Sequence, residues 1–225
     1  MGRGSNALGK CVVFLWVLFL VFIPTGSLPY IFFSLHAGSY AAGTPWLDPL
    51  NFKSKLLHLK NSVPLIVLQR DRGEGRVTCN CKGLPKISYE LDKNDKKSMV
   101  TGLLHALKIL EKSGSDYVST AHNDDIGIVC DNDEHSFSTY LNEVEKRGIE
   151  KHKIGVFSAH QMGSCRMGTS AETSVVDQNG ESWECKDLYI MDASIFPSAS
   201  GANPMITTLT LSHMLSLRLK NKLQD

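Results

Sequence analysis

Apolar runs with two different spacings divide the middle of the chain into strands and helices. Residues 65–69 form a β-like apolar run, residues 71–75 carry the charged and glycine positions of a turn, and residues 76–79 form a second short run. This order predicts two strands that pair as a hairpin. Alternating apolar and polar positions over residues 86–91 predict a third strand.

Two segments in the middle of the chain have helical spacing. The first follows Asp92, a residue that can cap a helix, and ends at Gly114. Its apolar stripe consists of Met99, Leu103, Ala106 and Leu110. The second is a shorter amphipathic segment over residues 137–144, which ends at Gly148. A short strand at residues 117–118 and a polar loop over residues 122–135 are expected between them. A sheet with helices packed against it is an α+β fold.

The N-terminus is more apolar than the rest. Residues 11–23 form an unbroken run of 13 apolar residues after Arg3 and Lys10, and a second apolar stretch covers residues 30–35. As a helix the first run would measure roughly 20 Å, which is shorter than the ~30 Å hydrocarbon core of a bilayer. Three interpretations stay open: a membrane anchor formed by residues 11–35, a signal peptide, or non-native sequence.

Composition narrows the possible partners. The net charge is +1 and no basic block is interleaved with aromatic residues, so no nucleic-acid partner is expected. The six cysteines contain no C-x-x-C pair and match no common zinc spacing. Residues 131–133 lack the glycine and terminal glutamate of an EF-hand loop. We therefore expect free thiols in a reducing compartment and no metal site.

Three motifs near the C-terminus carry a resemblance to a known family. They are His-Gln-Met-Gly-Ser-Cys-Arg-Met-Gly over residues 160–168, Met-Asp-Ala-Ser-Ile-Phe-Pro over residues 191–197, and Gly-Ala-Asn-Pro-Met over residues 201–205. Together they resemble the C-terminal signature of the glucose–methanol–choline (GMC) family of FAD-dependent alcohol oxidoreductases. The wording around residues 158–168 and 70–77 looks like the long-chain fatty alcohol oxidase branch of that family.

The resemblance implies a cofactor, a reaction and a set of site residues. The cofactor is FAD, and the reaction converts a long-chain primary alcohol and oxygen to an aldehyde and hydrogen peroxide. His160 matches the base and Asn203 its partner, while the flavin-facing positions are Asp192, Ala193, Asn203, Pro204 and Met205. Histidine suits proton removal because it titrates near neutral pH.

The start of the last predicted helix supports this assignment. Asn203 is a favoured helix N-cap and Pro204 a favoured first residue, so a helix is expected to run from there to about residue 219. The positive end of its dipole would face the flavin. The resemblance also places Asp192 at the end of a strand over residues 188–191.

The phosphate-binding turn of dinucleotide-binding folds has no match in the sequence. No G-x-G-x-x-G follows a predicted strand. We therefore expect a partial GMC fold without its Rossmann core: residues 1–45 as an apolar segment, residues 46–155 as part of a substrate-binding domain, and residues 156–225 as the flavin-facing segment. Such a truncated chain is expected to bind FAD poorly by itself.

Two other roles compete with catalysis by this chain. The first is a non-catalytic interaction protein, anchored to an intracellular membrane through residues 11–35. The second is complementation, in which a separate polypeptide provides the flavin domain.

Overall fold

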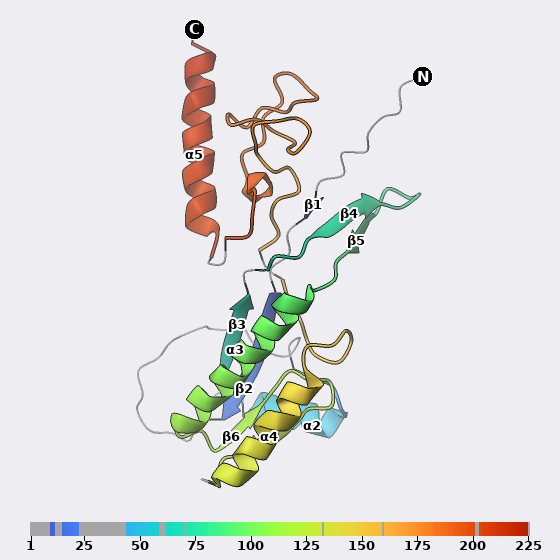
Figure 1. Ribbon diagram of the computed structural model, residues 1–225, viewed down its shortest axis with the longest axis vertical. Coiled ribbons are helices and arrows are strands. Elements are labelled where there is room, and N and C mark those ends of the chain that lie inside the picture. Colours follow the sequence, from blue (N-terminus) through green and yellow to red (C-terminus); the bar gives the residue numbers. More distant parts are fainter. Residues whose placement is uncertain are drawn as a thin grey trace. The chain divides into compact units, whose positions relative to one another are not determined.

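The computed structural model describes residues 10–11, 15–22, 44–58, 62–69, 71–131, 133–158, 160–200 and 203–224 (Figure 1). This part of the chain contains four α-helices and two small sheets, which confirms the expected α+β class. The helices are α2 (Pro49–Leu57), α3 (Lys93–Lys112), α4 (Glu134–Arg147), α5 (Met205–Lys222) and the 3₁₀ turn η2 (Ala193–Ile195). The strands are β1 (Lys10–Cys11), β2 (Leu15–Phe22), β3 (Ser62–Gln69), β4 (Gly75–Cys79), β5 (Pro85–Ser88), β6 (Tyr117–Ser119) and β7 (Gly127–Val129).

The chain folds into two compact units. Unit 1 combines residues 1–15, 70–95 and 158–225, and unit 2 combines residues 16–69 and 96–157. All three C-terminal motifs therefore belong to unit 1, together with the β4–β5 hairpin. The domain limits expected at residues 45 and 155 stay predictions.

Unit 2 is built on a four-stranded sheet with the order β3-β2-β6-β7. β2 and β6 are antiparallel, with Leu20 opposite Ser119, and β6 and β7 form a hairpin in which Tyr117 faces Val129. Figure 1 shows α3 running alongside β3. A Cβ atom on Gly102 of α3 would lie only 2.7 Å from Cγ1 of Val67.

Apolar side chains of α3, β6 and α4 form the core of unit 2. Met99, Leu103 and Leu107 of α3 are fully buried, as are Val118 of β6 and Val144 of α4. This burial explains why the apolar stripe of α3 was visible in the sequence, because one face of the helix packs into the core along its length. The caps follow expectation as well: Asp92 accepts from the backbone N of Asn94 at 2.8 Å.

Unit 1 contains a three-stranded sheet in the order β1-β4-β5 and a long irregular segment covered by α5. β4 and β5 are antiparallel, with Arg76 opposite Ser88 and Cys79 opposite Pro85. Leu215 of α5 is fully buried, and a Cβ atom on Gly180 would lie 3.2 Å from its Cδ1. Gly180 has a φ of +79°, a conformation open to glycine at little cost.

Three local predictions from the sequence were wrong. β3 and β4 do not form a hairpin, because β4 pairs with β5 while β3 joins the other sheet. The expected polar loop over residues 122–135 contains β7. Residues 188–191, all of which the structure describes, form no strand, and only Tyr189 makes an isolated bridge, to Glu181.

The apolar N-terminal run differs from the helix considered for it. Its first residue, Cys11, ends β1. The longer described part, β2, is a strand of the sheet in unit 2, which suits its valine, phenylalanine and tryptophan content. Residues 12–14 and 23–35, the rest of the expected anchor, lie outside the described residues. None of the helices among the described residues has the length and apolar character needed to cross a bilayer.

Candidate active site

Backbone hydrogen bonds join the first two C-terminal motifs. The amide nitrogen of Gly163 donates to the carbonyl of Ala193 at 3.3 Å, and that of Cys165 to the carbonyl of Ser194 at 2.9 Å. Met167 continues the pattern by donating to Ile195 at 2.8 Å. The segment after His160 is thus aligned along η2, so motifs separated in the sequence form one local structure.

Asp192 organises the turn that holds this alignment. Its Oδ1 accepts from the backbone N of Ser194 at 2.8 Å and also from the Ser194 hydroxyl. The next apolar residues, Ile195 and Phe196, are buried. Because a carboxylate at this position satisfies an otherwise open N–H of η2, the position of Ala193 is well defined.

The third motif begins α5, with one change from expectation. The N-cap position is Pro204, with φ −80° and ψ −6°, and no side chain caps the helix. Asn203, which was expected to supply the cap, instead makes a side-chain hydrogen bond with His160. The sequence therefore predicted the start of the helix within one residue. The role of the Asn203 side chain differs from the prediction, because its amide interacts with His160 and does not cap the helix.

His160 is half-buried, and two opposing influences act on its ring. Burial lowers the pKa of His160, and the hydrogen bond with Asn203 partly offsets that shift by raising it. A histidine pKa below the ordinary value of about 6.5 leaves the imidazole neutral at neutral pH. A neutral ring can accept a proton, as the predicted role of His160 requires.

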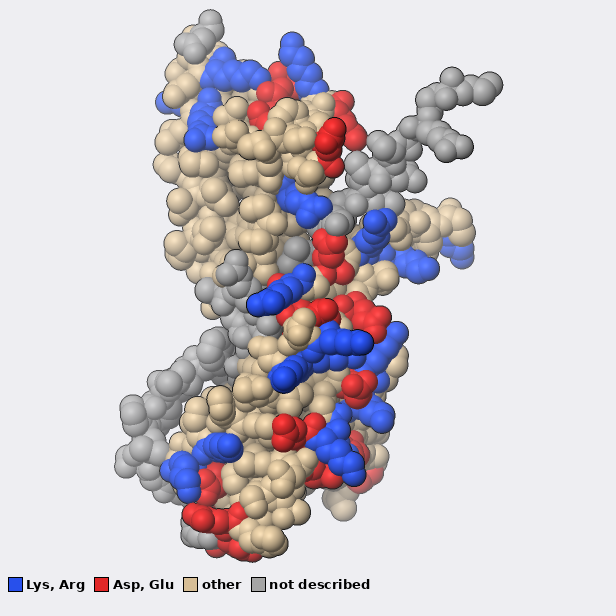
Figure 2. Space-filling view, viewed as in Figure 1, with Lys and Arg blue, Asp and Glu red and all other residues tan. Residues whose placement is uncertain are grey.

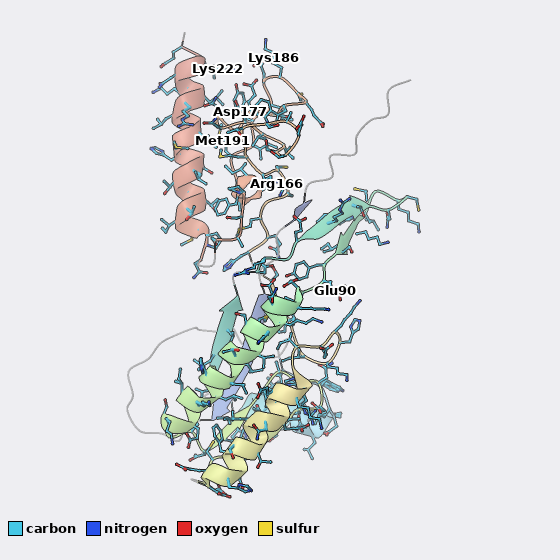
Figure 3. All side chains as sticks on the ribbon, viewed as in Figure 1. Glu90, Arg166, Asp177, Lys186, Met191 and Lys222 are labelled. Carbon is cyan, nitrogen blue, oxygen red and sulfur yellow. The ribbon has the colours of Figure 1, made fainter. Side chains whose placement is uncertain are left out.

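Polar contacts attach α5 to the strip of chain that carries Met191 (Figure 3). The Ser212 hydroxyl donates to the carbonyl of Met191, and the Ser216 hydroxyl lies 3.5 Å from its Sδ. Further along the helix, Arg218 donates to the carbonyl of Gln178 at 2.9 Å. The sequence signal for these contacts is a pair of serines one helical turn apart on α5.

The C-terminal end of α5 carries an exposed ion pair. Lys222 Nζ lies 2.8 Å from Glu181 Oε2 and 2.5 Å from the hydroxyl of Tyr189. The hydrogen bond from Lys222 lowers the pKa of Glu181 to about 2. Both carboxylate and ammonium face solvent, so we assign the pair a role in orienting the helix end and little stability.

The visible surface has no large patch of a single charge sign (Figure 2). Figure 2 shows Lys and Arg interspersed with Asp and Glu over the visible face. Among the described residues, no group of three or more His, Cys, Asp or Glu side chains could hold a metal ion.

Comparison with known proteins identifies the family. The model of the GMC oxidoreductase family matches residues 71–212. Long-chain-alcohol oxidase FAO3 from Arabidopsis thaliana is 37% identical over 190 residues, which are 82% of this chain and 25% of the relative. Long-chain-alcohol oxidase FAO4B from the same organism is 35% identical over 192 residues, covering 83% of this chain and 25% of the relative.

The chain thus spans about a quarter of the length of these relatives. Among solved structures, pyridoxine 4-oxidase from Mesorbium loti aligns with a TM-score of 0.59 at 14% identity, over 96% of this chain and 44% of that one. A formate oxidase aligns with a TM-score of 0.58 at 14% identity, over 96% of this chain and 48% of the other. These structural likenesses support the partial fold expected from the motifs. The family match covers more than half of the chain, and the chain therefore belongs to the GMC oxidoreductase family.

Proposed function

We propose that this protein takes part in the FAD-dependent oxidation of a long-chain primary alcohol to an aldehyde, with oxygen as electron acceptor and hydrogen peroxide as second product. The backbone hydrogen bonds that align the segment after His160 with η2 are the observation that carries the proposal. They join two of the motifs that match the family signature, and Asn203, which matches the partner of the base, interacts with the His160 ring. The substrate class is supported by the names of the relatives, which are long-chain-alcohol oxidases.

His160 and Asn203 would divide the handling of the substrate hydroxyl. The neutral imidazole of His160 accepts the hydroxyl proton, so that negative charge grows on the substrate oxygen as the carbon–hydrogen bond weakens. The amide of Asn203 contains both a donor and an acceptor. It can hold the His160 ring through one group and direct the other toward the substrate oxygen. FAD, when bound, supplies the hydride acceptor.

The start of α5 fits a flavin. The helix has 18 residues and no side-chain cap, so its first-turn N–H groups are available to an electron-rich ring edge. Met205 is 67% exposed beside them and offers an apolar surface to a flat ring. Pro204 and Ala193 would complete the flavin-facing set, and Asp192 would hold Ala193 in place through η2.

The test replaces the base in the complete enzyme, in which this chain is combined with the segment or partner that binds FAD. His160→Ala should lower turnover of a long-chain alcohol by roughly 10²–10⁴-fold, the usual contribution of a general base. FAD content, measured from the flavin absorbance, should stay at the level of the unmodified protein. His213→Ala is the matched control, because this exposed histidine of α5 lies outside the motifs. Unchanged turnover in His160→Ala with normal FAD content would refute the assignment.

A second candidate role is that of a subunit completed by a separate flavin-binding polypeptide. Ile206 and Leu209 favour it, since these large apolar side chains of α5 are 67% and 61% exposed. Exposed apolar clusters of this kind often mark contact surfaces. Copurification of a flavin-containing protein, abolished by Leu209→Asp, would support this role. Isolation of the unmodified chain without such a partner from its native source would argue against it.

A further inference from the structure

The β4–β5 hairpin is a two-stranded ribbon closed by a well-defined loop. Cys79 lies opposite Pro85 at the end of the ladder. In the loop, the backbone N of Asn80 donates to the carbonyl of Leu84 at 2.9 Å, and the Asn80 Oδ1 accepts from the backbone N of Leu84 at 2.9 Å. Gly83 has a φ of +75°, the left-handed conformation common in three-residue hairpin loops. The register of the hairpin is therefore set, and with it the residues on each face.

Alternation along the two strands gives the hairpin one apolar and one basic face. Residues directly opposite each other share a face, and neighbours along a strand lie on opposite faces. The residues of the apolar hairpin face are Val77, Cys79, Pro85 and Ile87. Those of the basic hairpin face are Arg76, Thr78, Lys86 and Ser88. The hairpin is thus amphipathic.

The outer part of the apolar hairpin face is open to solvent. Ile87 is 68% exposed, and Cys79 and Pro85 are exposed beside it. Leu84 adds a further exposed apolar side chain at the end of the loop. Exposed apolar surfaces with a polar rim mark contact sites for proteins or membranes.

The charge of the hairpin favours a membrane surface. Arg76, Lys82 and Lys86 are all exposed, and no Asp or Glu occurs from residue 75 to residue 89. None of the three cations forms an ion pair with another residue in the described part of the chain. Anionic headgroups above an apolar layer complement unpaired cations beside an apolar face.

We propose that the β4–β5 hairpin binds an anionic lipid surface. The apolar hairpin face lies toward the acyl chains, and Arg76, Lys82 and Lys86 lie at the level of the lipid phosphates. Long basic side chains can extend to the phosphates while their alkyl parts stay on apolar surface.

The proposed substrate gives this contact a use. A long-chain alcohol is mostly apolar, so it partitions from water into a bilayer. A hairpin bound at the lipid surface holds the chain close to such a substrate. This reason rests on the proposed function, whereas the faces and the charge of the hairpin do not depend on it.

Thiol alkylation in the presence of vesicles reports on the hairpin itself. The full chain is mixed with vesicles of phosphatidylcholine and phosphatidylserine, or of phosphatidylcholine alone, and a charged, water-soluble maleimide is added. Digestion and mass spectrometry give the alkylation rate of each cysteine. We expect the anionic vesicles to protect Cys79, which lies on the apolar hairpin face, and the neutral vesicles to protect it far less. Cys185 is the control, because it is exposed outside the hairpin and should react at the same rate throughout.

Neutralising the cations tests the electrostatic part of the contact. Each cation near an anionic surface contributes roughly fivefold in affinity, so Lys82→Gln with Lys86→Gln should raise the lipid concentration for half-protection roughly 25-fold. Lys108→Gln with Lys112→Gln is the matched control, because these lysines are also exposed and four residues apart, but on α3. The control should leave the protection of Cys79 unchanged.

A carboxylate on the apolar hairpin face tests the apolar part. Ile87→Asp should abolish the protection of Cys79, because the carboxylate would have to leave water on contact with the acyl chains. Ile109→Asp is the matched control, since Ile109 is 60% exposed on α3. It should not change the protection.

Three results would each overturn the proposal. Full reactivity of Cys79 with anionic vesicles is the first, and sedimentation of the chain with those vesicles would then assign the contact to another segment, such as residues 11–35. The second is equal protection by both kinds of vesicle, which would show that the cations take no part. The third is protection by a copurifying polypeptide without lipid, which would assign the apolar hairpin face to a protein. Because no alcohol is present and no turnover is measured, a failed oxidase assignment would leave these results unaffected.

Discussion

The imidazole of His160 is a residue whose protonation can be followed without turnover. Burial holds the pKa of His160 below its ordinary value, and the hydrogen bond with Asn203 acts in the opposite direction. Replacing Asn203→Ala removes the contribution that raises the pKa, so protonation should move to still lower pH. Histidine proton resonances recorded against pH by NMR measure this shift. An upward shift of the pKa of His160 would contradict the hydrogen-bond assignment.

Lys55 and Asp125 form a buried ion pair in unit 2. Their side chains are only 8% and 6% exposed, and Asn51 adds a hydrogen bond to the Asp125 carboxylate at 3.2 Å. Lys55→Met leaves that carboxylate buried without its cation and should lower the free energy of unfolding by about 3–5 kcal/mol. Asp125 has a φ of 54°, so Asn is the suitable replacement, because it tolerates the left-handed conformation.

The matching double variant separates charge from packing. In urea unfolding, Lys55→Met combined with Asp125→Asn should cost less than the sum of the two single changes, because the second change removes the stranded charge. Strict additivity would show that the two side chains do not interact.

At the scale of single residues, the sequence predicted which residues belong to the candidate site better than it predicted their contacts. The order of the motifs was enough to select His160 and Asn203, because their spacing is distinctive. The order of the motifs could not show that the side chain of Asn203 would interact with His160 and leave α5 uncapped. The His160 ring and the open N–H groups at the start of α5 are both good partners for an amide side chain. That choice depends on where the chain between the motifs places the ring.

Among the elements, α5 offers a direct comparison of a buried and an exposed leucine. Leu215 is fully buried near Gly180, whereas Leu217 is 48% exposed on the same helix. Leu215→Ala should lower the free energy of unfolding by about 2–5 kcal/mol through lost burial and a cavity. Leu217→Ala should change it by no more than about 0.5 kcal/mol. Equal effects in chemical denaturation would show that α5 is not docked through Leu215.

Helices were predicted more accurately than strand pairing for a physical reason. The stripe and caps of α3 and α4 are encoded within a few neighbouring residues, so local reading finds them. Pairing of β3 with β2, and of β2 with β6, joins segments far apart in the sequence. The run at residues 65–69 therefore identified a strand but not its sheet. The secondary structure of β2 was harder to predict, because an all-apolar run is compatible with a buried strand and with a membrane helix.

For the molecule as a whole, the distribution of the flavin-facing residues leads to a prediction about cofactor binding. His160, Asp192, Ala193, Asn203, Pro204 and Met205 all belong to unit 1. They would contact the ring region of FAD, whereas the sequence has no G-x-G-x-x-G turn to hold the pyrophosphate. The phosphates carry much of the charge of FAD, so the residues present should bind the cofactor weakly.

We expect the purified chain, incubated with excess FAD and dialysed, to retain well under one flavin per polypeptide. Flavin absorbance divided by protein concentration gives this ratio. A flavin-binding partner polypeptide should raise it toward one, and Met205→Asp should reduce that gain, because a carboxylate at the exposed start of α5 would repel an electron-rich ring. Stoichiometric FAD in the chain alone would contradict the expectation. It would show that the phosphates are held by backbone N–H groups of this chain without a glycine-rich turn.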